Sequence, residues 1–166
     1  MLKKLKIWQK LALIAAAFGL AVPAVLYLVL SDRLEARDAT LKRAEGLEYI
    51  RVVFPVFLKV PQHRGQTNAL LGGDLSQVAV LDELAPQIDA DLATLSTFDS
   101  QLGNRFGTTE DLADIRSRWT ALREESRGLP QTESWRRHTE LVADVLALLL
   151  KVADTSGLRA DPDIGN

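Results

Sequence analysis

Apolar residues follow two different patterns along the 166 residues of this chain. Residues 11–30 form a run without any charged side chain, and residues 3, 4, 6 and 10, just before it, are lysines. After residue 30, apolar side chains recur every three or four positions, which is the period of an α-helix with one buried face. No segment shows the strict alternation of a half-buried strand. The sequence therefore predicts an all-α fold.

The uncharged run predicts a transmembrane helix over residues 11–30. Twenty residues of α-helix cover about 30 Å, which matches the hydrocarbon core of a bilayer. The lysines place the preceding tail, residues 1–10, in the cytoplasm, because positive charge is retained on that side. Residues 31–166 are then expected outside, so that the chain is a single-pass protein of the cell inner membrane with a periplasmic or extracellular bulk. The alternative is a cleaved signal peptide, whose apolar region is shorter (about 7–15 residues) and ends in small residues, unlike Val25–Leu30.

Four helical segments are predicted from the apolar spacing and from the residues that end helices. The first continues the membrane helix and ends at Gly72-Gly73, and Pro55 and Pro61 are expected to disturb it. The others span about 74–102, with Asp74 as N-cap and a bend or division at Pro86, then 108–128, and 132–156. Because each segment has one apolar stripe, the stripes must face one another in an antiparallel bundle.

Composition and motifs narrow the function. All 22 acidic residues follow residue 30, but only 16 of the 20 basic ones do, so residues 31–166 have a net charge of about −6. A negative charge does not suit binding to nucleic acid. The chain has no cysteine and two histidines, His63 and His138, and His138 is expected to be a half-buried packing residue. It contains no phosphate loop, zinc-protease motif or nucleophile elbow. We therefore expect no enzyme activity, no catalytic residue, no cofactor and no metal site. Trp119 and Trp135 lie on the apolar stripes and are predicted to be core residues.

One polar cluster, residues 62–68, interrupts the apolar pattern. His63 and Thr67 are four residues apart and share a helix face, and Arg64 lies beside them. A guanidinium is a planar fork of donors that suits carboxylate, nitrate or phosphate. We therefore name Arg64, His63 and Thr67 as the candidate ligand-binding residues. The alternative is a polar helix turn in which Arg64 pairs with an acidic neighbour.

Two segments resemble a known family. The sequence Gln62-His63-Arg64-Gly65-Gln66-Thr67, followed by Ala69 to Asp74, is similar to the "Q-H-R-G-x-[ST]" segment of helical extracytoplasmic sensor domains. Trp119, residues 138–142 and residues 152–158, followed by Asp161-Pro162-Asp163, resemble the end of the first half of such domains. These domains occur in bacterial methyl-accepting chemotaxis receptors and in some membrane-bound diguanylate cyclases, and the Arg-Gly element is also similar to one in nitrate- and nitrite-sensing helical domains. The resemblance covers about residues 40–163.

The resemblance implies a membrane-anchored sensor domain of a chemoreceptor-like signal transduction protein. It implies binding of a small molecule between helices, with an anion as the candidate ligand, and formation of a homodimer. Such receptors continue with further helices, a second membrane span and a cytoplasmic signalling region, so we expect the bundle here to be incomplete: either a fragment of a receptor or a stand-alone module. The alternative function is a membrane-anchored structural or assembly module that docks a partner membrane protein through an exposed helix face.

Overall fold

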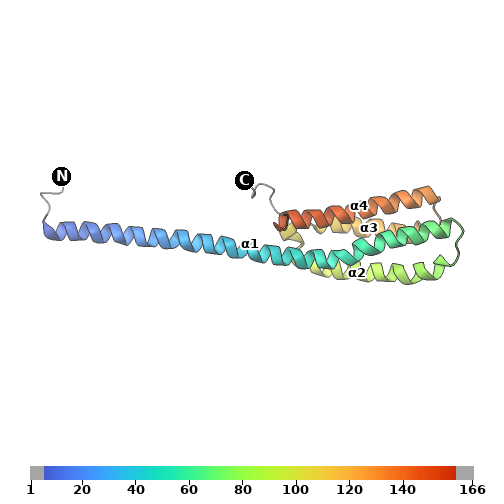
Figure 1. The fold of residues 1–166 in the computed structure, drawn as a ribbon, viewed down its shortest axis with the longest axis horizontal. Coiled ribbons are helices and arrows are strands. Elements are labelled where there is room, and N and C mark those ends of the chain that lie inside the picture. The colour runs from blue at the N-terminus through green and yellow to red at the C-terminus, as the bar shows by residue number, and fades with distance from the viewer. Residues whose placement is uncertain (1–5, 160–166) are drawn as a thin grey trace. The chain divides into compact units, whose positions relative to one another are not determined.

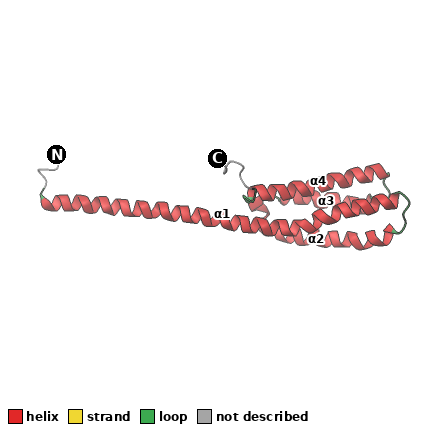
Figure 2. Ribbon diagram, viewed as in Figure 1, coloured by secondary structure: helices red, strands yellow, loops and turns green. Residues whose placement is uncertain are grey.

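The computed structural model describes residues 6–159. It consists of the helices α1 (Ile7–Leu71), α2 (Gln77–Phe106), α3 (Thr109–Glu125) and α4 (Gln131–Thr155), and the described residues contain no strand (Figures 1 and 2). The predicted all-α fold is confirmed. Within the helices, the side chains of residues 9, 10, 12–18, 21, 22, 24, 32 and 35 are outside the description. Residues 1–5 of the predicted basic tail and the Asp161-Pro162-Asp163 element also lie outside the described residues.

The chain divides into two units, residues 1–41 and 42–166, and α1 contributes to both. The first unit contains the predicted transmembrane segment, which is helical throughout. Among the described residues, no helix combines the length and the apolar character that crossing a membrane requires. Residues 12–18, 21, 22 and 24 of the predicted segment are among those whose side chains are not described. Its described apolar side chains are exposed, for example Leu20 at 77% and Tyr27 at 73%.

The second unit is a four-helix bundle in which neighbouring helices run antiparallel. Polar contacts at two levels define three of the neighbouring pairs: residues 49 and 59 of α1 meet 99 and 91 of α2, residues 82 and 89 of α2 meet 127 just after α3 and 119 within it, and residues 111 and 118 of α3 meet 151 and 144 of α4. Between α1 and α4, residues 63 and 64 meet 138 and 139 at one level, and Gly46 lies against Ser156 at the other. The four described helices thus form a closed ring. The C-terminal part of α1 supplies the fourth wall.

The bundle core consists of apolar side chains from all four helices. They include Val53, Ile88, Trp119, Leu141 and Leu148, each at most 1% exposed. A fully buried aliphatic side chain contributes about 1.5–3 kcal/mol through its removal from water. The stripes read from the sequence are therefore what holds the helices together.

The end of α2 differs from the one expected, and the division considered at Pro86 is not found. Pro55, Pro61 and Pro86 do not end a helix, so that α1 and α2 are each continuous through them. Helix α2 also continues past Gly103, where the sequence predicted its end, and stops at Gly107, whose positive φ of 68° suits a residue without a side chain. The extension places Phe106 in the core at 1% exposure.

Asp99 links this end of α2 to α1 inside the bundle. Its Oδ1 accepts hydrogen bonds from the Tyr49 hydroxyl at 2.5 Å and from the Thr108 hydroxyl at 2.6 Å. Thr108 precedes α3 but makes no side-chain capping bond, because its hydroxyl is directed to Asp99. Burial, followed by the bond to Asp99, raises the pKa of Tyr49 far above its usual value, so the phenol remains a donor.

Candidate functional site

The three predicted ligand-binding residues do not face the same environment. Arg64 is half-buried beside α4, whereas His63 and Thr67 are 2% and 0% exposed and point into the core. The reason is geometric: residues 63 and 67 share the inward face of α1, and residue 64 is rotated by about 100° toward its edge. The structure therefore separates a buried histidine cluster from a partly accessible arginine.

The buried cluster is a pair of histidines that joins α1 to α4. Nδ1 of His63 lies 2.9 Å from Nε2 of His138, and Nδ1 of His138 lies 2.7 Å from the Ser134 carbonyl oxygen. A carbonyl only accepts, so His138 must carry its proton on Nδ1. In the neutral ring its Nε2 then accepts, and His63 must donate from Nδ1. The two imidazoles thus have defined tautomers and form a directed chain from His63 through His138 to Ser134.

The surroundings of the pair keep both rings neutral. The His63 ring meets Trp119 edge to face, with centroids 4.9 Å apart, and Thr67 Oγ1 lies 3.4 Å from its Nδ1. Burial, and then the positive charge that His138 and Arg127 can contribute, lowers the pKa of His63 to about 3. Burial is also the main cause that lowers the pKa of His138. His138 is therefore a fully buried, hydrogen-bonded residue and not the half-buried packing residue expected from the sequence.

Arg64 lies over the outer edge of the same α1–α4 contact. Its guanidinium carbon is 4.4 Å from the centroid of the Trp135 ring, and its Nη1 donates to Thr139 Oγ1 at 3.1 Å. Its Nε is buried and has no hydrogen-bond partner. Among the described residues, no carboxylate comes within 4.0 Å of the guanidinium. The acidic partner considered in the sequence analysis is therefore not found in the described part of the chain.

Trp135 and Thr139 are the residues of this site that sequence reasoning missed. Trp135 was expected in the core, but it is 44% exposed and presents its ring to Arg64. The two residues are four positions apart and therefore share one face of α4. That spacing was visible in the sequence, but nothing there indicated that the face would meet Arg64, which lies about 70 residues earlier.

The arrangement at Arg64 suits the binding of an anion. A guanidinium stacked on an indole ring keeps its in-plane N–H groups free for a planar acceptor. Among the described residues, no group of three histidine, cysteine, aspartate or glutamate side chains is placed to hold a metal ion.

Comparison with known proteins finds no family model, curated protein or solved structure that matches this chain. The resemblance to helical sensor domains thus stays a prediction from the two sequence segments.

Proposed function

We propose that this chain is a membrane-anchored helical sensor module that binds a small anion at Arg64. The proposal rests on the surroundings of the Arg64 side chain. It is partly buried, its Nε has no partner, and no described carboxylate balances its charge. An isolated charge that is partly removed from water destabilises the fold unless an opposite charge or hydrogen-bond acceptor joins it. A bound anion supplies both.

The geometry favours a planar oxyanion such as a carboxylate or nitrate. Stacking on Trp135 and the bond to Thr139 fix the guanidinium plane. Guanidinium N–H groups form a flat fork that matches the two oxygens of such an anion. Asn68, one helical turn after Arg64, adds an amide on the same face of α1.

The membrane anchor in this proposal is the uncharged run 11–30. Its support is the length of the run, the lysines before it and the exposure of its described apolar side chains, which no described residue covers. A bilayer would cover them. The bundle would then lie outside the cell membrane, where it meets external ligands.

Anion binding at Arg64 offers a way to change the bundle, because the site is shared by two helices. Arg64 belongs to α1, and Trp135 and Thr139 belong to α4. A ligand that draws the guanidinium away from Thr139 favours a different α1–α4 packing, provided that it binds the two packings with unequal affinity. Helix α1 also includes the proposed membrane segment, so a shift of α1 would transmit ligand binding from the bundle to the membrane.

Calorimetric titration of the full chain in mild detergent with nitrate and with acetate tests this proposal. We expect saturable binding that Arg64→Gln abolishes and that Arg64→Lys weakens, because an ammonium group lacks the planar fork. Arg51→Gln is the matched control, because Arg51 also lies on α1 but is 79% exposed and pairs with Glu48. Equal loss in the Arg51 variant, or unchanged binding in Arg64→Gln, would contradict the proposal.

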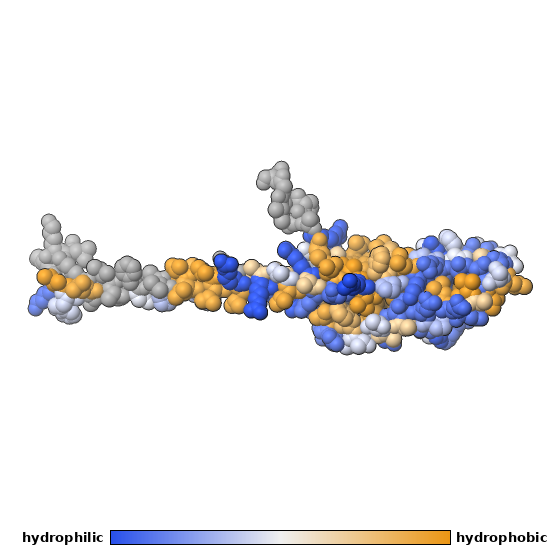
Figure 3. Space-filling view, turned by 60° about the horizontal axis from the view of Figure 1, so that its bottom comes forward, coloured by the Kyte–Doolittle hydropathy of each residue, from blue (hydrophilic) through white to orange (hydrophobic). Residues whose placement is uncertain are grey.

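A second candidate function is supported by apolar side chains on the bundle surface. Helix α1 exposes Leu47, Phe54 and Leu58 by 47–58%, and the neighbouring α4 exposes Leu146 and Leu150 by 42–45%. Hydrophobic patches are visible between polar ones on the face of the bundle in Figure 3. Such a face suits an assembly module that docks the helix of a partner membrane protein. Phe54→Glu would then remove a stoichiometric partner on purification from membranes and leave anion binding intact.

A further inference from the structure

A second polar site lies between α3 and α4, on a different face of α4 from Trp135 and Thr139. It is an open hollow of about 350 Å³. Its lining residues are Arg118, Ala121 and Leu122 from α3 and Arg136, Arg137 and Glu140 from α4. Its volume falls in the range of small-molecule sites. The lining holds three guanidinium groups and one carboxylate, and further carboxylates pair with the guanidinium groups.

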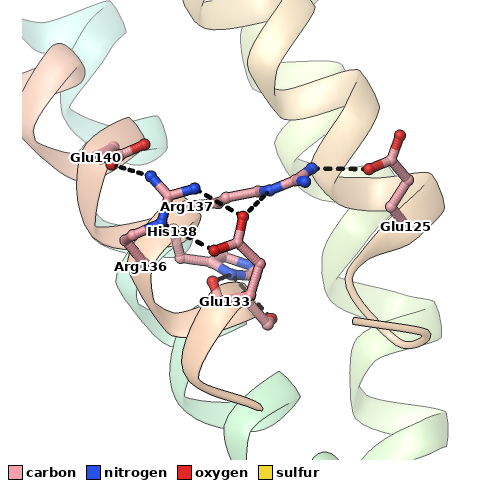
Figure 4. Close-up of polar contacts among 7 residues, drawn as sticks. Glu125, Glu133, Arg136, Arg137, His138 and Glu140 are labelled. Atoms are coloured by element: carbon pink, nitrogen blue, oxygen red, sulfur yellow. Dashed lines mark hydrogen bonds and ion pairs between the residues drawn. The ribbon is translucent and has the colours of Figure 1, made fainter. Parts of the chain in front are cut away.

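Carboxylates around the hollow hold the α4 guanidinium groups in place (Figure 4). Glu133 accepts hydrogen bonds from Nη2 and Nε of Arg136 at 2.7 and 2.9 Å and from Nε of Arg137 at 2.7 Å. Arg137 also reaches Glu125 with Nη1 at 2.8 Å, and Arg136 bonds to Glu140. These bonds from Arg136, and then those from Arg137, lower the pKa of Glu133 to about 2, so it stays ionised at neutral pH.

The guanidinium groups keep donors for a ligand despite these bonds. A guanidinium has five N–H groups. Contacts with described residues occupy Nε and Nη1 of Arg137, and the ion pair with Asp144 at 3.0 Å occupies Nη1 of Arg118. Nη2 of Arg137 and the Nε and Nη2 edge of Arg118 remain. A guanidinium held on one edge presents the other with little further loss of side-chain freedom, which favours binding.

We propose that this α3–α4 hollow is a binding site for a small oxyanion with two or more carboxylate or phosphate groups. One acidic group is bound by Arg137 and a second by Arg118, and Ala121 and Leu122 contact the carbon or oxygen skeleton between them. A ligand with one acidic group reaches only one of the two arginines and binds more weakly. The site lies on the outer groove between α3 and α4, and it is independent of the proposed function at Arg64.

Calorimetric titration of the full chain in detergent with citrate and with inorganic pyrophosphate tests the proposal, and acetate is the probe with a single acidic group. We expect Arg118→Gln and Arg137→Gln each to weaken binding about tenfold or more. Ala121→Phe fills the hollow without changing any charge, and it should abolish binding. Arg116→Gln is the matched control, because this exposed α3 arginine lies outside the lining residues.

The outcomes distinguish a specific binding site from non-specific electrostatic attraction. If Arg116→Gln weakens binding as much as Arg118→Gln, or if Ala121→Phe binds normally, the anion is attracted by net charge and the proposal is wrong. The absence of saturable binding also overturns it. Citrate and pyrophosphate affinities distinguish a carboxylate from a phosphate ligand. Arg64→Gln should leave binding at the α3–α4 hollow unchanged. The titrations therefore test this proposal and the proposed function at Arg64 independently.

Discussion

The histidine pair predicts that the bundle loses stability as the pH falls through the weakly acidic range. In the folded state the pKa of His63 is about 3, whereas an unfolded chain has an imidazole pKa near the usual 6.5. Between these values the unfolded state binds a proton that the folded state does not bind. The free energy of unfolding must therefore fall as the pH decreases below about 6.5.

The magnitude follows from the same two pKa values. Each pH unit below 6.5 costs about 1.4 kcal/mol per imidazole, so the free energy of unfolding drops by about 2 kcal/mol between pH 7 and pH 5 through His63. His138 acts in the same direction, because its pKa is also lowered. Glu133, with a pKa of about 2, remains ionised in the folded state, and it is still mostly ionised in the unfolded state at pH 5, so it adds little change in this window.

Urea unfolding of the full chain at pH 7 and pH 5, followed by near-ultraviolet circular dichroism, measures this effect. The matched variant combines His63→Asn with His138→Gln, because these amides place a donor near Nδ1 of residue 63 and an acceptor near Nε2 of residue 138. We expect its stability to be nearly independent of pH in this range. A wild-type stability that is equal at both pH values refutes the reasoning. So does an NMR titration in which both histidines become protonated near pH 6.5 while the chain stays folded.

Three further changes test the packing of the bundle by urea unfolding at neutral pH. Gly103→Ala should destabilise the bundle by about 1–3 kcal/mol, because an added Cβ would lie 2.5 Å from the Asp99 carboxylate oxygens. Gly65→Ala is the contrasting control: a Cβ added there has no neighbour within 4 Å, so this change should stabilise α1 by about 0.5–1 kcal/mol. Tyr49→Phe should lower the free energy of unfolding by about 1.5–3 kcal/mol, because it removes a buried donor from Asp99. A decrease below about 0.5 kcal/mol would show that this hydrogen bond does not stabilise the fold. Leu148→Ala should cost about 2–5 kcal/mol, since it leaves a cavity at a position that is 1% exposed, and an unchanged midpoint would contradict the described core.

Helix content and approximate helix positions could be predicted from the sequence because they depend on local spacing. The three-to-four residue period identified the stripes that form the core, and Gly72-Gly73 marked the end of α1. The predictions failed where a distant residue decided the outcome. Gly103 looked like a helix end, but α2 continues through it because Phe106 enters the core and packs against Tyr49 of α1.

The candidate site shows the same division. Arg64 stood out from its residue type and its place in a polar cluster, and the structure places it at an α1–α4 edge beside Trp135 and Thr139. His63 and Thr67 were grouped with it because they are close in sequence. The rotation of α1 about its axis, which depends on the apolar faces of the other helices, turns both of them into the core.

By itself, the sequence determined that this protein is helical, where its apolar stripes run, and that residues 11–30 carry no charge. Only the tertiary structure decided that His63 meets His138, that Trp135 stacks on Arg64, and that Arg118 shares a hollow with Arg137. The physical reason is that hydrogen bonding within a helix depends on neighbours in the chain. Contacts between side chains of different helices depend instead on how all four helices rotate to bury their stripes together.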